Sequence, residues 1–146
     1  MKLLLIIAVA LTSCAYGQEI PSETKTTALG RPAYVGKDNV LTVNIVFDGN
    51  PDTNRTVLVR ALGPSLGIAN ALEDPTLEIR DANGTLAIND DWKSNQEGAI
   101  RATGLAPNSE KESAILLGLG GGRYTAIVRA KEGTQGMAMV EAYVLR

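Results

Sequence analysis

Residues 75–88 read Pro-Thr-Leu-Glu-Ile-Arg-Asp-Ala-Asn-Gly-Thr-Leu-Ala-Ile and predict a β-hairpin. In the first half, Leu77 and Ile79 alternate with charged residues, so one face of the strand is apolar and the other is polar. The Asn-Gly pair in the middle favours a tight turn because both residues tolerate positive φ. We expect the returning strand to place Leu86 and Ile88 inward, as the second half of one sheet face.

Outside this hairpin, short apolar runs alternate with turn residues rich in Gly, Pro, Asn and Asp. One segment, 94–103, has weak helical character. Seven or eight strands at short spacing, with at most one short helix, predict an all-β fold, an antiparallel two-sheet β-sandwich of jelly-roll type. The further strands are expected at 40–47, 56–62, 113–117, 123–129 and 137–145.

Composition restricts the functions that this chain can have. Its 146 residues suit one domain, 45% of them are hydrophobic, and the net charge of −2 argues against a nucleic-acid partner. There is no His, which removes the commonest general base and metal ligand. The single Cys is Cys14, so a metal site in the folded part would need oxygen ligands, which favours calcium.

The amino-terminal segment is typical of an export signal, because Lys2 precedes a short apolar run at 3–11. Two cleavage sites compete. Small residues at 15 and 17 predict a signal peptide of residues 1–17, whereas Leu-Thr-Ser-Cys at 11–14 resembles a bacterial lipobox and predicts a signal of 1–13 with Cys14 lipidated. We therefore expect a secreted or extracytoplasmic protein, either free or bound to the membrane through a lipid anchor.

Two further segments follow the signal. Residues 18–37 are rich in Thr, Ser, Gly and Pro and predict a flexible tether or a loose first strand. Residues 38–146 form the expected β-sandwich domain.

Six motifs in the folded part occur in one order. They are Arg-Ala-Leu-Gly-Pro-Ser-Leu-Gly at 60–67, Asp-Pro-Thr-Leu-Glu at 74–78, Asn-Asp-Asp-Trp at 89–92, Ala-Thr-Gly-Leu-Ala-Pro at 102–107, Glu-Ser-Ala at 112–114 and Tyr-Thr-Ala-Ile-Val at 124–128. Together they resemble a domain of about this size that occurs, often in several copies, in large secreted proteins of verrucomicrobial and planctomycete-type bacteria. The Asp-x-Asn-Gly hairpin followed by Asn-Asp-Asp is more distantly similar to the bacterial pre-peptidase C-terminal domain. These resemblances imply a β-sandwich and export, but no catalytic activity.

An acidic group around the hairpin is the candidate metal site. We expect the turn to bring Asp81 roughly opposite Ile88, which would place Asp81 near the acidic residues that follow the hairpin. Oxygen ligands gathered on one loop edge suit Ca²⁺. The alternative is turn chemistry, in which Asp and Asn bond to their own backbone. The candidate ligands are Asp81, Asn83, Asn89, Asp90 and Asp91.

Three other features have a chemical and a structural interpretation. Trp92, the single Trp, would either stack on a sugar or close one end of the sandwich. Ser65 has the Gly-x-Ser-x-Gly spacing of a nucleophile elbow, but the chain has no His to activate it, so a conformational role fits better. The glycine-rich run at 118–122 precedes a strand and predicts a hairpin turn, not a phosphate loop.

These residues favour a non-catalytic extracytoplasmic module for binding, adhesion or scaffolding. Its partner would be a protein or a glycan at the cell surface, or a second copy, because sheet edges accept neighbouring strands. One alternative is a calcium-dependent carbohydrate- or matrix-binding domain that uses the acidic group and Trp92. A small glycan hydrolase with Asp90 and Asp91 is less favoured, because adjacent strand residues point to opposite faces.

Overall fold

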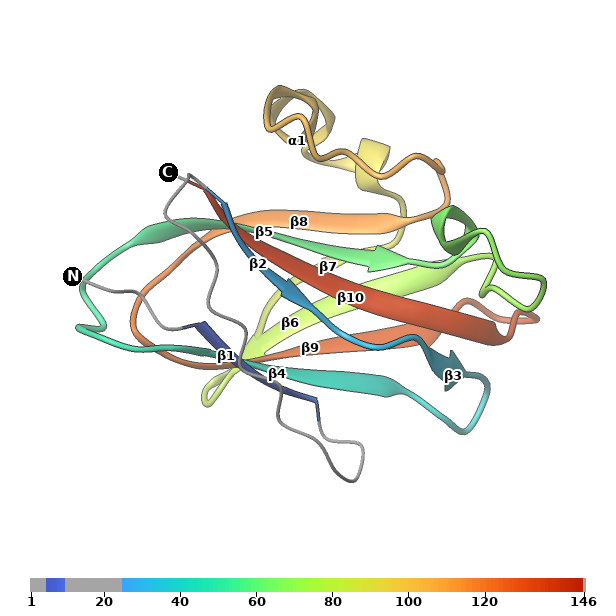
Figure 1. Cartoon of the computed structure of the whole chain (residues 1–146), viewed down its shortest axis with the longest axis horizontal. Helices are drawn as coiled ribbons and strands as arrows, with labels where there is room; N and C mark the ends of the chain where they lie inside the picture. The colour runs from blue at the N-terminus through green and yellow to red at the C-terminus, as the bar shows by residue number, and fades with distance from the viewer. Residues whose placement is uncertain (1–4, 10–24, 146) are drawn as a thin grey trace.

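The computed structural model describes residues 5–9 and 25–145, and side chains from residue 30 onward. It confirms the predicted antiparallel two-sheet β-sandwich (Figure 1). Within the described residues, eight strands lie between residues 33 and 145, and two more precede them. The single α-helix is short, as expected. The strands are β1 (Leu5–Val9), β2 (Lys25–Leu29), β3 (Ala33–Val35), β4 (Leu41–Phe47), β5 (Arg55–Leu62), β6 (Pro75–Asp81), β7 (Gly84–Asn89), β8 (Ser113–Leu119), β9 (Gly122–Ala130) and β10 (Gly136–Leu145).

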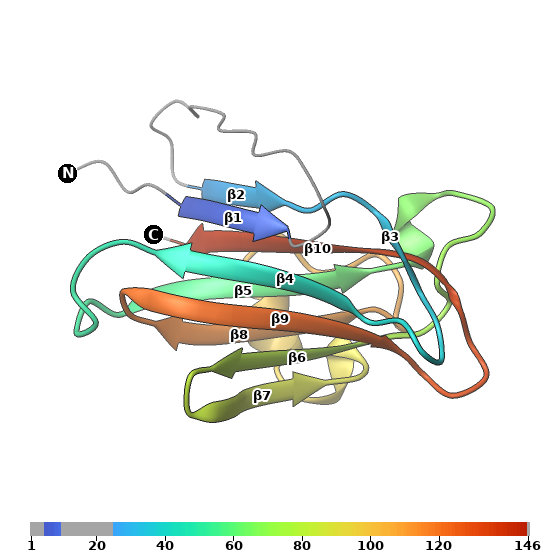
Figure 2. The same cartoon turned by 90° about the horizontal axis from the view of Figure 1, so that it is seen from below.

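The first sheet has the order β1-β4-β9-β6-β7, and the second has the order β2-β10-β5-β8, with β3 also paired to β10. Figure 2 shows the strands of the first sheet side by side, with the second sheet behind them. Among the pairs that follow one another from β4 to β10, the hairpin of β6 and β7 stays within one sheet. The other connections cross between the sheets, so each sheet is assembled from strands distant in sequence.

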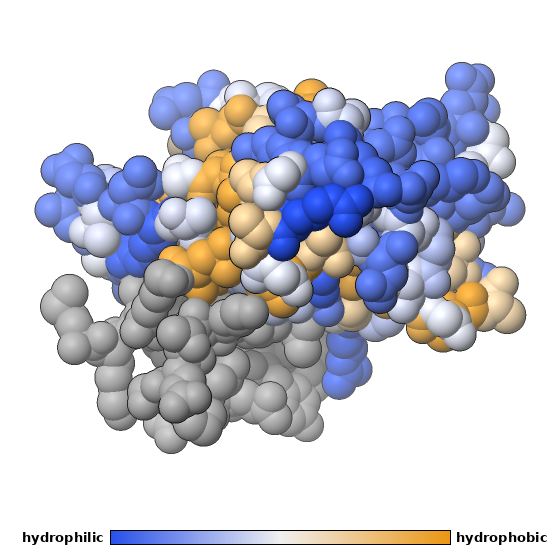
Figure 3. Space-filling model, turned by 90° about the horizontal axis from the view of Figure 1, so that it is seen from above, coloured by the Kyte–Doolittle hydropathy of each residue, from blue (hydrophilic) through white to orange (hydrophobic). Residues whose placement is uncertain are grey.

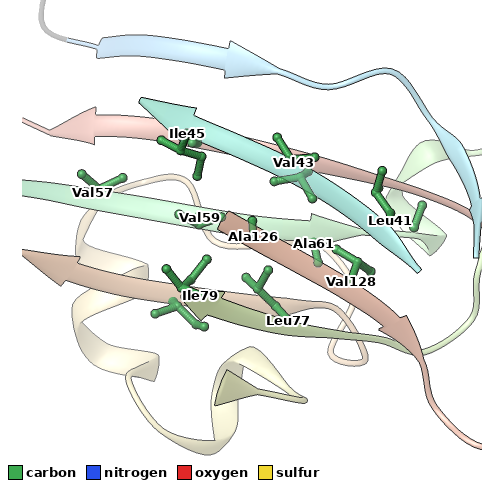
Figure 4. Close-up of a cluster of buried hydrophobic side chains, with 14 of the residues drawn as sticks. Leu41, Val43, Ile45, Val57, Val59, Ala61, Leu77, Ile79, Ala126 and Val128 are labelled. Atoms are coloured by element: carbon green, nitrogen blue, oxygen red, sulfur yellow. The ribbon is translucent and has the colours of Figure 1, made fainter. Parts of the chain in front are cut away.

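The core fills the space between the sheets, where alternate residues of each strand point inward. β4 shows this best, because Val43 and Ile45 are buried while their neighbours are partly exposed. Figure 4 shows the side chains of four strands pointing toward one another across this space. The labelled members are Leu41, Val43, Ile45, Val57, Val59, Ala61, Leu77, Ile79, Ala126 and Val128.

β5 is buried on both faces, as its continuous apolar run predicts. It lies between β10 and β8, and its Val57 and Val59 face the core. Its Leu58 faces the other way and is also buried, in a second cluster with Trp92 and Ile100. The 3₁₀ turn η2 (Trp92–Ser94) and the helix α1 (Glu97–Ala102) provide this cover on the outer face of the second sheet (Figure 1).

The returning strand of the hairpin faces the opposite way from our prediction. Ile88 pairs with Glu78 on the outer face, whereas Ala87 pairs with Ile79 and packs against the core. Leu86 is 45% exposed and Ile88 is 65% exposed. The turn is tight, and a β-bulge after Ile79 shifts the register, so the inward positions fall one residue away from those expected.

The amino-terminal segments contain strands. β1 lies inside the expected signal peptide and pairs with β4. β2 and β3 lie within residues 18–37, which the sequence predicts to be either a tether or a loose first strand. Both strands pair with β10. Cys14 and both expected cleavage sites lie outside the described residues.

In the part of the chain that the structure describes, no helix is both long and apolar enough to cross a membrane.

Candidate functional site

The hairpin register separates the expected calcium ligands into two groups. Asp81 pairs with Gly84 at the turn, while Asn89 pairs with Leu77 at the other end of the hairpin. At about 3.3 Å per strand residue, these ends lie roughly 13 Å apart. The expected opposition of Asp81 and Ile88 therefore does not occur, and the structure does not bring Asp81 and Asn83 to Asp90 and Asp91.

Two of the expected ligands hold local structure instead. Asp81 Oδ1 accepts hydrogen bonds from the backbone N–H groups of Asn83 (2.7 Å) and Gly84 (3.1 Å). Asn89 donates from Nδ2 to the carbonyl of Asp91 (3.1 Å), and its Oδ1 accepts from the Ala114 N–H (3.1 Å). The contacts of Asp81, and that of Asn89 with Asp91, are the turn chemistry that the sequence offers as the alternative to metal binding. The contact of Asn89 with Ala114 instead joins the end of β7 to β8.

A different acidic group forms where β7 ends. Asp74 joins Asp90 and Asp91, and one carboxylate oxygen from each lies within 4.8 Å of the others. Asp90 and Asp91 follow the strand and so do not point to opposite faces as expected. Asp74 directly precedes β6 while the other two follow β7, so the hairpin register, which pairs Leu77 with Asn89, brings all three together.

The group of Asp74, Asp90 and Asp91 is partly neutralised. Lys131 Nζ lies 2.8 Å from Asp90 Oδ2 and 3.7 Å from Asp74 Oδ2. Burial raises the pKa of the Asp74 carboxyl, and the nearby Asp90 and Asp91 charges raise it further, while Lys131 opposes them. Oδ1 of Asp74 and Oδ1 of Asp90 are buried without a hydrogen-bond partner among the described residues. This trio, rather than the predicted group, has the oxygen atoms that a cation would take.

Trp92 does not form an exposed stacking surface. It is 3% exposed, and its indole N–H donates to the Ser109 carbonyl at 3.0 Å. The guanidinium of Arg101 and the ammonium of Lys93 lie 5.0 and 5.6 Å from its ring centroid. Trp92 is thus buried, as the structural interpretation expects, but it covers the outer face of the second sheet and does not close one end of the sandwich.

Ser65 belongs to a buried clamp around Glu112, which is 0% exposed. The Glu112 carboxylate accepts from the Ser65 hydroxyl (2.5 Å) and from the backbone N–H groups of Gly63 (2.9 Å), Ser65 (2.7 Å) and Ser109 (3.3 Å). Four donors satisfy the buried charge and fix the turn η1 (Pro64–Leu66) against the loop before β8. The sequence around Glu112 does not predict this role, since its donors come from positions more than forty residues away as well as from its own loop.

The glycine run forms the expected turn, between β8 and β9. Gly120 and Gly121 pack directly on the turn between β4 and β5. A Cβ on Gly120 would lie 1.8 Å from the Pro51 carbonyl oxygen, and one on Gly121 would lie 2.1 Å from that of Gly49. Close approach of two backbones therefore explains these glycines, without a phosphate-binding role.

β8 and β7, which each end one sheet, differ in how their outer backbone groups are covered. β8 is the last strand of the second sheet, and side chains occupy its outer edge. Gln96 donates from Nε2 to the Leu116 carbonyl (2.8 Å) and accepts at Oε1 from the Leu116 N–H (2.9 Å). The Asn89 side chain accepts from the Ala114 N–H, and the backbone N–H of Trp92 donates to the Glu112 carbonyl (2.9 Å). We call this the closed edge.

β7 is the last strand of the first sheet and pairs, among the described residues, with β6 alone. It reads Gly-Thr-Leu-Ala-Ile-Asn and contains no charged residue and no Pro, the features that commonly protect edge strands. Leu86 and Ile88 are exposed on it. We call this strand the open edge, and it is the candidate site for another chain.

Hydrophobic surface also occurs next to the cover of the second sheet. Viewed from the side that carries α1, the molecule shows a hydrophobic band between hydrophilic regions (Figure 3). Four apolar side chains pack at the margin of the second cluster and stay partly exposed: Leu105, Ala106, Leu116 and Leu145.

No protein-family model matches this chain, and no curated protein sequence matches it either.

Proposed function

We propose that this chain is a non-catalytic, extracytoplasmic scaffolding or adhesion module that assembles by pairing its open edge with that of a second copy. The observation that carries the proposal is the contrast in edge protection: side chains block the edge of β8, while β7 is uncharged and exposes two large apolar residues. An unpaired edge of this kind accepts an additional strand through backbone hydrogen bonds.

The chemistry of β7 favours a second copy as the partner. Antiparallel pairing of two β7 strands about a two-fold axis near Ala87 would place Leu86 of one copy beside Ile88 of the other. The strand has no charged residue, so this self-pairing sets no like charges opposite each other. Both apolar side chains lie on the outer face and would cover each other across the new boundary.

Sedimentation analysis over a wide range of protein concentrations tests the pairing. The wild-type chain should dimerise as concentration rises, and Ile88→Lys should remain monomeric because two lysines would face the boundary. Ile68→Lys is the matched control, since Ile68 is 42% exposed in a loop away from β7. A wild-type chain that stays monomeric at every concentration, or an Ile68→Lys variant that loses association equally, contradicts the proposal.

The extracytoplasmic part of the proposal rests on the amino-terminal sequence. Free secretion predicts a mature protein that begins at Gln18, and lipidation predicts one that begins at a diacylated Cys14. Either cleavage removes β1, so in the mature chain the edge of β4 also loses its neighbour. Intact mass of the mature chain from a bacterial host distinguishes these outcomes, and an uncleaved chain would contradict export. The resemblance to domains of large secreted proteins supports the same location.

A second candidate function is calcium-dependent binding of a carbohydrate or matrix component, centred on Asp74, Asp90 and Asp91. The supporting observation is the pair of buried carboxylate oxygens without a donor. Calcium at millimolar concentration should raise the melting temperature of the wild-type chain and leave Asp90→Asn unchanged. An equal shift in both, or no shift in either, contradicts this candidate.

A further inference from the structure

A cavity opens on the outer face of the second sheet, apart from the open edge. Its volume is about 360 Å³, near the lower end of the range for small-molecule sites. Neighbouring strands β5 and β10 form its floor with Arg60, Leu62, Met139 and Glu141. The turn η1 forms one wall, and the loop at Pro107 forms another. The Glu112 clamp fixes both walls, so the cavity is built before any ligand arrives.

The polar part of the floor is an ion pair between directly opposed residues. Arg60 Nη2 donates to Glu141 Oε2 and to the Tyr143 hydroxyl (2.9 Å), and the Tyr143 hydroxyl donates to the same Glu141 oxygen (3.0 Å). Arg60 Nη1 donates to the Leu105 carbonyl (2.8 Å). The side chains of Arg60 and Glu141 are 14% and 9% exposed. These contacts hold a donor and an acceptor side by side in fixed positions.

The apolar part of the lining lies next to this pair. Leu62 and Met139 pair across β5 and β10, next to the Arg60–Glu141 pair on the same face of the sheet. Leu66 and Pro107 line the sides of the cavity. Asn108 stands at the rim, exposed, and its amide makes no hydrogen bond to any described residue. The exposed lining is thus more polar than apolar, and it combines a few apolar side chains with hydrogen-bonding groups of both kinds.

The charges of the lining determine which ligands fit. Arg60 and Glu141 neutralise each other, so the floor carries no net positive charge for an anion. The buried Glu112 carboxylate lies behind Ser65, which is part of the lining, and it disfavours a second negative charge nearby. A phosphate, a sulfate or a uronic acid is therefore a poor match.

We propose that this cavity binds one neutral sugar residue of a glycan, without calcium. A pyranose ring offers an apolar C–H face to Leu62, Leu66 and Met139, and its neighbouring hydroxyl groups both donate and accept. Those hydroxyls suit the Arg60–Glu141 pair and the rim amide of Asn108. A half-open cavity bounded on two sides suits one compact residue better than an extended peptide, which needs a long groove.

Chemical-shift mapping of the wild-type chain tests the site, with glucose, galactose, mannose, N-acetylglucosamine and glucuronic acid as probes. At least one neutral sugar should shift the amide signals of Arg60, Leu66 and Asn108 in a saturable way, in the presence of a calcium chelator. Asn108→Ala should weaken that binding roughly three- to tenfold, the effect of one lost hydrogen bond.

Asn83→Ala is the matched control, because Asn83 is equally exposed but lies in the hairpin turn of the other sheet. Its affinity should equal that of the wild type. Ile88→Lys should also bind the sugar normally, which separates this site from the self-pairing proposed above. No saturable shift with any neutral sugar, tighter binding of glucuronic acid, or equal binding by Asn108→Ala and the wild type would overturn the inference.

Discussion

β7 and β8 each end a sheet of the same sandwich, yet the chain treats their outer edges differently. At the closed edge, the Gln96 amide binds both backbone groups of Leu116 and so takes the place of a neighbouring strand. At the open edge, no described side chain plays this role, and Ile88 is 65% exposed. The difference shows that a short covering segment can occupy the backbone groups of an edge strand, and it is the basis for the assembly through β7 that we propose.

The largest expected effect removes the anchor of the cover. Trp92→Ala should lower the free energy of unfolding by about 3–5 kcal/mol, because it empties a buried aromatic site between α1 and the sheet. Urea denaturation measures the loss. The variant should also gain association through β8, which would make the two edges alike. A variant as stable as the wild type would show that the cover does not depend on Trp92.

Removal of the edge amide should have a smaller effect. Gln96→Ala leaves the N–H and the carbonyl of Leu116 without their partners and should cost about 1–3 kcal/mol. Amide hydrogen exchange should accelerate most at Leu116.

Gln135→Ala is the control for this variant. Gln135 directly precedes β10 and accepts a hydrogen bond from the exposed Tyr34 hydroxyl. Protection of Leu116 that is equal in the Gln96 variant and in this control would contradict the closed-edge interpretation.

The acidic group at the end of β7 predicts a pH dependence. The pKa of Asp74 is raised above its ordinary value of 3.8, chiefly by burial, so the folded state holds this proton more tightly than the unfolded state. Stability from this carboxyl is therefore greatest in acid and falls as pH rises through the raised pKa. Asp74→Asn should be more stable than the wild type at neutral pH, and the difference should vanish in acid.

Glu73→Gln is the comparison, because the pKa of Glu73 is shifted in the opposite direction from that of Asp74. A hydrogen bond and the charge of Lys111 lower the pKa of Glu73. The stabilisation from Glu73 is thus present above its ordinary pKa and is lost as pH falls through the lowered one. Thermal melts of both variants between acid and neutral pH should diverge in opposite directions, and parallel profiles would contradict the assignment.

The smallest expected effect is at the open edge itself. Ile88→Thr keeps a β-branched side chain at an exposed strand position and should change the free energy of unfolding by less than about 0.5 kcal/mol. Its dimerisation should nevertheless be weaker than that of the wild type in sedimentation experiments. A large loss of stability would show that Ile88 supports the fold of the single chain.

Local patterns in the sequence predict the strands well. The alternation at Leu77 and Ile79 and the double-sided run of β5 are both seen in the structure, because each depends on the faces of a single strand. The facing of Leu86 and Ile88 was wrong because a bulge changes the count of residues after the turn. Periodicity within one strand cannot contain that information.

The features of the site that the sequence does not predict depend on how separate segments meet. Gln96 binds the backbone of Leu116 only once β8 has joined the second sheet. Asp74 meets Asp90 through the hairpin of β6 and β7, whose register depends on the bulge. In the sequence, Gln96 is one polar residue before a short helix, and nothing in its neighbourhood distinguishes it. The expected metal site depends on a turn that sets Asp81 opposite Ile88, whereas the observed turn pairs Asp81 with Gly84 and keeps Asp81 away from Asp90 and Asp91.

The position of Trp92 has a practical consequence. It is the single Trp of the chain and lies in the segment that covers β8. Its emission therefore reports on this segment alone, with no contribution from another indole. A red shift of this emission that precedes the loss of circular dichroism during denaturation would mark detachment of the cover from an intact sandwich. The intrinsic fluorescence can therefore show when the edge of β8 becomes exposed, without a dye or an isotope.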